Sequence, residues 1–159
     1  MQISRTDMQD SSKTFANLNG AALAQRCRML IADDGLNQLT GTILAAAIEV
    51  HRVLGPGLLE SIYIECIEHE FQTRGLHFVR QVSVPITYKG TRLRSSYRID
   101  LTVEDKVVVE VKSFEVLAPV CKAQVLTYLR ITGKPAGLLI NFNVPRLMDG
   151  VKRLINPSR

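Results

Sequence analysis

The sequence contains no long hydrophobic run. No apolar stretch approaches the roughly 20 residues that a helix needs to cross a bilayer. Residues 1–10 are polar and contain no apolar signal region. Internal repeats and low-complexity tracts are also absent. We therefore expect a soluble, cytoplasmic protein without a membrane partner, and 159 residues suffice for one domain with a buried core.

The sequence is also poor in cysteine and histidine, with three of each. Cys27, Cys66 and Cys121 are odd in number and far apart, so they match neither a zinc finger nor a disulfide framework. We expect free, mostly buried thiols in a reducing compartment. The histidines show no ligand spacing either and are interpreted as structural or surface residues.

Acidic residues are outnumbered, 15 against 20 Lys and Arg, which gives a net charge of +5 and a pI near 9.3. This balance permits a polyanionic partner without requiring one. Arg92, Arg94 and Arg98 gather beside strand-like segments and are the candidate nucleic-acid contacts. Charge alone is a weak indication of nucleic-acid binding, and the expectation of a nucleic-acid partner, DNA more than RNA, rests on the family resemblance given below.

The first third of the chain favours helices. Residues 1–37 are predicted to form an N-terminal extension, partly helical or disordered, with a helix over Phe15 to Ile31 that ends at Asp33-Asp34-Gly35. From Leu39 to Leu54, apolar residues recur at helical spacing until Gly55-Pro56-Gly57 breaks the pattern.

A second helix is predicted from about Leu58 to Gln72. Its expected core contacts are Leu59, Ile62, Cys66, Ile67 and Phe71. Glu60 lies in its first turn, and Tyr63 shares a face with it three residues on. Glu60 is either a carboxylate favoured by the helix dipole or a functional acid, and Tyr63 is otherwise a half-buried aromatic.

Strand patterns follow over Phe78 to Tyr88 and Leu93 to Val103, separated by a Lys89-Gly90 turn. Pro85 lacks an N–H, so its strand is expected at a sheet edge or bulged there. A helix is predicted from Pro119 to about Ile131.

The apolar run Ala136 to Phe142 is typical of a strand covered on both sides. Val144 to Ile155 fits a short helix or a strand equally well. The order of elements predicts an α/β (α+β) layer in which a helical crossover places the last strand parallel to a neighbour.

Two carboxylates and a lysine are predicted to share one face of a hairpin. Val107 to Val109 favour a strand, and Glu104-Asp105-Lys106 suits a three-residue loop. That register places Asp100 opposite Glu110, with Lys112 on the same face two residues further on. Facing carboxylates repel each other unless a positive group lies between them.

Two carboxylates and a lysine on one face of a hairpin suit phosphodiester hydrolysis. Hard oxygen ligands bind Mg²⁺ or Mn²⁺, and Lys112 could orient a water or stabilise charge on the phosphate. Glu60 is the candidate further metal ligand beside Asp100 and Glu110. Gln124 and Tyr128, four residues apart on one helix face, could position phosphate or water. The alternative is a solvated strand face held by salt bridges.

The surroundings of this hairpin resemble a known family. Gly57 to Tyr63 matches the Gly-x-x-Glu-x-x-Tyr signature of the GxxExxY protein family. Further blocks of resemblance occur in the right order at His51–Gly57, Tyr88–Gly90, Arg98–Asp100, Glu110–Lys112, Ala123–Leu129 and Gly137–Asn143. The resemblance covers residues 38–159 and leaves the N-terminal extension outside.

The GxxExxY family is grouped with the PD-(D/E)xK nuclease-like superfamily, so the resemblance implies a restriction-endonuclease-like core with a mixed central sheet flanked by helices. It also implies that Asp100, Glu110 and Lys112 are the acidic pair and lysine, that Glu60 contributes to the metal site, and that Gln124 and Tyr128 are its polar helix residues. Two positions depart from the pattern. Ile99 replaces the proline, and Cys121 stands where a histidine is expected.

The first hypothesis is a Mg²⁺-dependent nuclease acting on DNA or RNA, in repair or defence. The second is a non-catalytic nucleic-acid- or protein-binding module on the same fold. The third is an enzyme acting on a small phosphorylated metabolite. A homodimer or a partner is plausible, because the chain leaves little room for a separate recognition domain.

Overall fold

The structure, a computed structural model, describes residues 20–158, and it describes side chains from residue 34 onward. It divides into two compact units, Met1–Asn37 and Gln38–Arg159. In the first unit, the described part is helical from Gly20. The expected helix start at Phe15 lies outside the described residues.

The first helix, α1 (Gly20–Leu54), is continuous through the segment that the sequence predicted as a break. The prediction that Asp33-Asp34-Gly35 ends a helix is wrong. Asp34 and Gly35 are exposed, so the carboxylate of Asp34 stays solvated. Glycine in a helix interior costs only about 1 kcal/mol relative to alanine. A helix of 35 residues tolerates that cost.

The second unit forms a five-stranded mixed sheet with helices. Beyond the end of α1, its elements are α2 (Glu60–Thr73), β1 (Phe78–Tyr88), β2 (Thr91–Val103), β3 (Val107–Lys112), α3 (Pro119–Thr132), β4 (Ala136–Asn141), the 3₁₀ helix η1 (Leu147–Gly150) and β5 (Val151–Ile155). The strand order is β1-β2-β3-β4-β5. Only β3 and β4 pair in parallel, through the α3 crossover, and the other three pairings are antiparallel. The predicted mixed sheet flanked by helices is confirmed.

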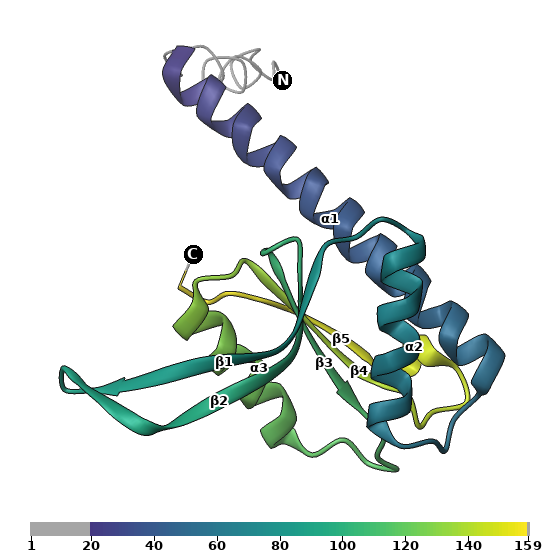
Figure 1. The fold of residues 1–159 in the computed structure, drawn as a ribbon. Helices are drawn as coiled ribbons and strands as arrows, with labels where there is room; N and C mark the ends of the chain where they lie inside the picture. Colours follow the sequence, from purple (N-terminus) through teal and green to yellow (C-terminus); the bar gives the residue numbers. More distant parts are fainter. Residues whose placement is uncertain (1–19, 159) are drawn as a thin grey trace, which may run out of the picture. The chain divides into compact units, whose positions relative to one another are not determined.

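Helices cover both faces of this sheet (Figure 1). On one face, α3 packs over a cluster of buried side chains from all five strands, in which Val108 and Leu139 meet Val125 and Leu129. On the opposite face, the Tyr63 ring of α2 stacks on Phe142 with centroids 4.3 Å apart. No described helix combines the length and the apolar character that crossing a membrane requires.

The buried face of α2 confirms two of the expected core contacts, Ile67 and Phe71, but not Leu59 and Ile62. Tyr63, Ile67 and Phe71 are buried, whereas Leu59 is 71% exposed and Ile62 is 39% exposed. The spacing of four residues follows one stripe of the helix toward the sheet. The helix begins at Glu60, so Leu59 lies outside it as the N-cap residue.

The first strand confirms the prediction for Pro85. Strand β1 is at the edge of the sheet, and its register with β2 shifts between Pro85 and Thr87. The β1–β2 hairpin closes at Lys89 and Gly90, both with positive φ, as a type I′ turn requires.

Glycine 137 allows α3 to approach β4 closely. A Cβ atom at this position would lie 2.6 Å from Cγ1 of the buried Val125. Valine is stiff at χ1, so it cannot easily turn aside. The absence of a side chain at Gly137 therefore sets the distance between the sheet and the helix that carries Gln124 and Tyr128.

We predict that Gly137→Ala lowers the free energy of unfolding by about 1–3 kcal/mol, because α3 must move outward or Val125 must leave its rotamer. Chemical denaturation measures this change. Gly41→Ala is the matched control, since Gly41 is exposed on α1 and has open space around it. That control should gain about 0.5–1 kcal/mol from helix propensity. Equal effects of the two substitutions would contradict the packing argument.

Candidate active site

The turn between β2 and β3 has the predicted length. Val103 pairs with Val107, which leaves Glu104, Asp105 and Lys106 as the loop. Glu104 and Asp105 both have φ of 51°, and the Lys106 N–H donates to the Val103 carbonyl at 3.0 Å. This turn fixes the register, so Glu110 lies on the α3 face together with Val108.

The strands separate where Asp100 lies. The β2–β3 ladder ends at the pair Leu101–Val109, so Asp100 and Glu110 lie one step beyond it and not in a paired register. Asp100 instead uses its side chain, because Oδ2 accepts a hydrogen bond from the Val111 N–H at 2.9 Å. The carboxylate of Asp100 therefore takes the place of a ladder hydrogen bond and is held beside β3.

Glu110 is buried beside the lysine. Its Oε1 accepts from the Lys112 ammonium at 2.7 Å, and the two side chains are 3% and 14% exposed. The other oxygen, Oε2, is buried and accepts no hydrogen bond of normal geometry among the described residues, although the backbone of Asp100 lies close enough to the Glu110 carboxylate to act on its pKa and lower it. A buried polar atom without a partner costs about 1–3 kcal/mol. This orphan oxygen is the feature of the site that protein contacts leave unexplained.

The charges at this site perturb one another. Burial raises the pKa of both Asp100 and Glu110, and the charge of Asp100 raises the pKa of Glu110 further. For Lys112, burial acts to lower the pKa, but the contact with Glu110 and the charges of Asp100 and Glu60 outweigh it, so the pKa is raised. The site holds more negative charge than one ammonium neutralises.

The glycine-containing loop between α1 and α2 positions Glu60 near this site. Gly55 and Gly57 have φ of 69° and 97°, and the loop that contains them leads into α2. The hydroxyl of the fully buried Tyr63 donates to the Gly55 carbonyl at 2.7 Å and accepts from the Leu58 N–H at 3.1 Å. Tyr63 is thus the residue that fixes the loop, and it is not merely a half-buried aromatic.

The end of β3 fixes Glu60 in turn. Glu60 Oε1 accepts from the Ser113 N–H at 3.2 Å, and the Ser113 hydroxyl donates to the Leu58 carbonyl at 2.6 Å. The Glu60 charge acts on both Asp100 and Lys112. Among the described residues, however, no three His, Cys, Asp or Glu side chains form a cluster that could hold a metal ion. Glu60 is brought near the pair as a charge, without completing a three-residue ligand set.

Helix α3 directs Tyr128 toward the site. This side chain is buried, and its hydroxyl donates to the Arg98 carbonyl at 3.4 Å. Burial and the charges of Glu110 and Asp100 raise its pKa, and Gln124 acts in the opposite direction. The phenol of Tyr128 is therefore protonated throughout the physiological pH range.

Two positioning residues were missed from the sequence. Ser113 ties the end of β3 to the loop before α2, as described above. Asn141, buried at the end of β4, exchanges hydrogen bonds with the backbone of Phe114 at 3.0 and 2.8 Å. Its only signal in the sequence was an amide at the end of an otherwise apolar strand.

The three candidate arginines do not enter the carboxylate cluster. All three side chains are exposed on β2. Arg98 acts electrostatically on Asp100, whereas Arg92 and Arg94 lie toward the turn end of the hairpin.

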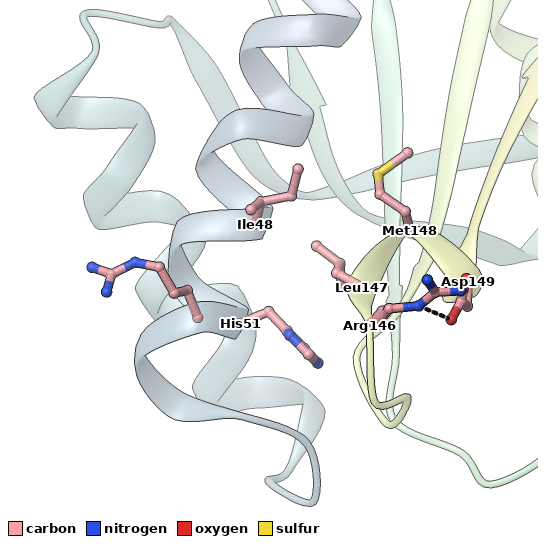
Figure 2. Close-up of a pocket in the computed structure, with 7 residues that line it drawn as sticks. Ile48, His51, Arg146, Leu147, Met148 and Asp149 are labelled. Carbon is pink, nitrogen blue, oxygen red and sulfur yellow. Dashed lines mark hydrogen bonds and ion pairs between the residues drawn. The ribbon is translucent and has the colours of Figure 1, made fainter.

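A hollow of about 550 Å³ opens elsewhere on the surface. Figure 2 shows its lining, where Ile48 and His51 of α1 face Leu147 and Met148 of η1, and Arg52 and Arg146 also belong to the lining. None of the candidate site residues lines it. His51 Nε2 hydrogen-bonds the Val144 carbonyl at 2.8 Å, and the two arginines pair with Glu49 and Asp149. Its polar groups thus have protein partners, and the carboxylate cluster lies elsewhere, so we do not assign the candidate active site to this hollow.

Comparison with known proteins agrees with the fold. The family model of the PD-(D/E)XK nuclease superfamily matches residues 37–154. The chain belongs to this superfamily. The comparisons with curated proteins and with solved structures found no match. Members of the superfamily are usually nucleases, and they generally use divalent metals such as Mg²⁺.

The residues of this PD-(D/E)XK protein fit a divalent cation. Glu110 Oε2 is a buried oxygen without a partner, and Asp100 has one carboxylate oxygen committed to Val111. Mg²⁺ prefers hard oxygen ligands and is commonly bound by one or two carboxylates together with water and substrate phosphate. Two protein carboxylates therefore suffice for the group that the superfamily generally uses.

The raised pKa of Asp100 predicts a stability difference that depends on pH. A carboxyl whose pKa is higher in the folded state makes the protein less stable as pH rises through the window between the unfolded and folded values. Asp100→Asn removes this penalty and keeps an oxygen for the Val111 N–H. We expect the variant to be more stable than the wild type at pH 8, by about 1.4 kcal/mol for each unit of pKa shift.

Denaturation at several pH values measures this effect, and the gain should disappear below about pH 4, near the unfolded pKa of aspartate. Asp105→Asn is the control on the same hairpin. Asp105 is exposed, and its contact with Lys134 lowers its pKa, so that substitution should act with the opposite sign. A stability difference between Asp100→Asn and the wild type that does not vary with pH would contradict a raised pKa of Asp100 in the folded state.

Proposed function

We propose that the protein is a metal-dependent nuclease that hydrolyses phosphodiester bonds of DNA, with RNA as the less favoured substrate. The observation that carries this proposal is the orphan Oε2 of Glu110, buried beside Asp100 and Lys112. A strand with a purely structural role gains little from a buried Glu110 and a half-buried Asp100 that share a single ammonium, because ion pairs of this kind contribute little net stability.

In the proposed site, Asp100 and Glu110 would hold Mg²⁺ or Mn²⁺, and Glu60 would add negative charge from the start of α2. When bound, the metal supplies Lewis-acid polarisation of the phosphate and a lower pKa for a coordinated water. Lys112 keeps its proton at neutral pH, so it can donate hydrogen bonds to a phosphate oxygen or orient the attacking water.

Tyr128 and Gln124 have a positioning role in this proposal. The protonated phenol of Tyr128 can donate but cannot act as a base at neutral pH. Gln124, half-buried on the preceding turn of α3, can supply an amide to the phosphate or to water. Arg98, exposed at the edge of the site, would contact the substrate backbone.

Within the superfamily, we infer membership of the GxxExxY family. The contacts of its signature residues support this. Tyr63 fixes the glycine loop by two hydrogen bonds, and that loop places Glu60 against the Ser113 N–H. In this signature, the tyrosine holds the loop in place, and the loop positions the glutamate beside the carboxylate pair. A cytoplasmic location and a homodimer stay predictions from the sequence.

The second candidate function is a non-catalytic binding module. One observation favours it. Cys121, buried at the start of α3, stands where the family resemblance leads us to expect histidine. If that histidine assists the reaction, its loss lowers activity. The binding module predicts salt-sensitive binding that survives substitution of Asp100 and Glu110.

Cleavage of labelled duplex and single-stranded DNA in Mg²⁺ or Mn²⁺ separates these functions. The wild type should cleave, and chelation by EDTA should stop it. Asp100→Ala and Glu110→Ala should abolish cleavage, and Lys112→Ala should lower it at least about 100-fold through loss of charge stabilisation. Asp105→Ala in the β2–β3 turn and Lys152→Ala on the edge strand β5, both exposed, should retain it. A wild type that cleaves neither DNA nor RNA would sink the catalytic proposal.

A further inference from the structure

The outer part of the β1–β2 hairpin, residues 85–96, is called the hairpin arm below. In Figure 1, this part extends beyond the other three strands of the sheet. We propose that the hairpin arm lies in the major groove of a DNA duplex, on one side of the phosphodiester held at the carboxylate pair. The inference rests on the proposed nuclease function and specifies its substrate.

The hairpin arm has no covering layer. All of its side chains are exposed except that of Ile86, which is half-buried. Tyr88 is 60% exposed and Leu93 is 41% exposed, although they are large apolar residues on a strand. Below the arm, by contrast, Ile99, Leu101 and Val103 of the same strand are fully buried. The arm therefore contributes little to the core, and its length calls for another explanation.

The charge of the hairpin arm is uniformly positive. Residues 81–97 contain Lys89, Arg92 and Arg94 and no acidic residue. None of these three cations forms a salt bridge within the part of the chain that the structure describes. The Lys89 ammonium lies over the Tyr88 ring at 5.5 Å from its centroid, a contact that does not neutralise its charge. Cations without a carboxylate partner on a projecting element are complementary to a phosphate backbone.

The root of the arm is fixed at the candidate active site. The Tyr97 ring meets Tyr128 edge-on at 5.5 Å, and the Tyr128 hydroxyl donates to the Arg98 carbonyl. On the other strand, Arg80 pairs with Glu68 of α2 at 3.3 Å. These contacts hold the direction of the arm relative to the carboxylate pair, so a substrate in the site would meet the arm at a defined distance.

That distance is set by the strand that joins them. Asp100 and Arg92 are eight positions apart along β2. At about 3.3 Å per residue they span at most about 26 Å. Because base pairs of B-DNA rise about 3.4 Å each, the arm would reach about six to eight base pairs from the cleaved bond.

The shape of the arm selects the kind of duplex. The major groove of B-DNA, about 12 Å wide, admits a two-stranded β-ribbon. The major groove of A-form RNA is too deep and narrow for protein side chains to read. Exposed apolar groups such as Tyr88 and Leu93 can contact thymine methyl groups in the wider groove. Duplex DNA is therefore the partner that both the charge and the dimensions of the arm favour.

The test compares two variants that each lose three positive charges. The arm variant carries Lys89→Ala, Arg92→Ala and Arg94→Ala. The control carries Arg130→Ala, Lys152→Ala and Arg153→Ala, which are exposed on α3 and β5. Both are made with Asp100→Asn so that the DNA stays intact, and thermal melting checks that they are folded. Binding of a fluorescent 30-base-pair duplex is measured against salt concentration.

We expect the arm variant to bind at least about 10-fold more weakly than the parent. The slope of the logarithm of its binding constant against the logarithm of salt concentration should be smaller in magnitude by about three, since each phosphate contact contributes about 0.9 to that slope. The control should lose no more than about 2-fold. Shortening the duplex flank on one side of the cut below about six base pairs should lower the affinity of the parent but not that of the arm variant.

Equal losses in the two variants would overturn the inference, because bulk charge would then explain the binding. Equal affinity of the parent for duplex DNA and for an RNA duplex or a single strand would overturn the assignment to the major groove. The cleavage assay tests the nuclease proposal independently of these binding measurements. A wild type that binds duplex DNA through the arm but cleaves nothing would retain the arm inference and refute catalysis.

Discussion

The electrostatic repulsion between Asp100 and Glu110 is the constraint on which the rest of this structure depends. Glu110 is buried and Asp100 is half-buried beside one ammonium, and the partial loss of solvent raises the pKa of both carboxyls. Such an arrangement weakens the folded state, because charged groups lose hydration that their partners only partly replace. A fold keeps this kind of cluster when a further positive charge arrives with function. An orphan oxygen on Glu110 indicates where that charge would be held.

The surrounding elements hold the repelling groups in place. The β2–β3 turn sets the register, and the Val111 N–H fixes Asp100 from the edge of β3. On one side, the loop that Tyr63 closes brings Glu60 to Ser113. On the other side, α3 packs closely over Gly137 and presents Tyr128 to the site. The carboxylates are thus positioned by packing and backbone hydrogen bonds, and electrostatic attraction plays the smaller part.

The sequence predicted the parts of this arrangement that depend on local patterns. Alternation and turn chemistry correctly placed β1, and the three-residue loop gave the register that brings Glu110 near Asp100. Contacts between distant segments were not predictable in this way. Ser113 and Glu60 are 53 residues apart, and nothing local indicates that the Tyr63 hydroxyl bridges a loop. The same limit explains the wrong helix break at Gly35, where a locally unfavourable residue is tolerated by a long helix.

A magnesium titration of thermal stability tests the central claim most directly. If Asp100 and Glu110 are arranged for a cation, Mg²⁺ should raise the unfolding temperature at pH 8. At a free Mg²⁺ concentration of 100 times the Kd, the free energy of unfolding should rise by about 2.7 kcal/mol. Glu110→Gln should abolish this gain, and Glu65→Gln, an exposed glutamate of α2, should keep it. A wild type that neither Mg²⁺ nor Mn²⁺ stabilises, or a Glu110→Gln variant stabilised equally, would contradict the account.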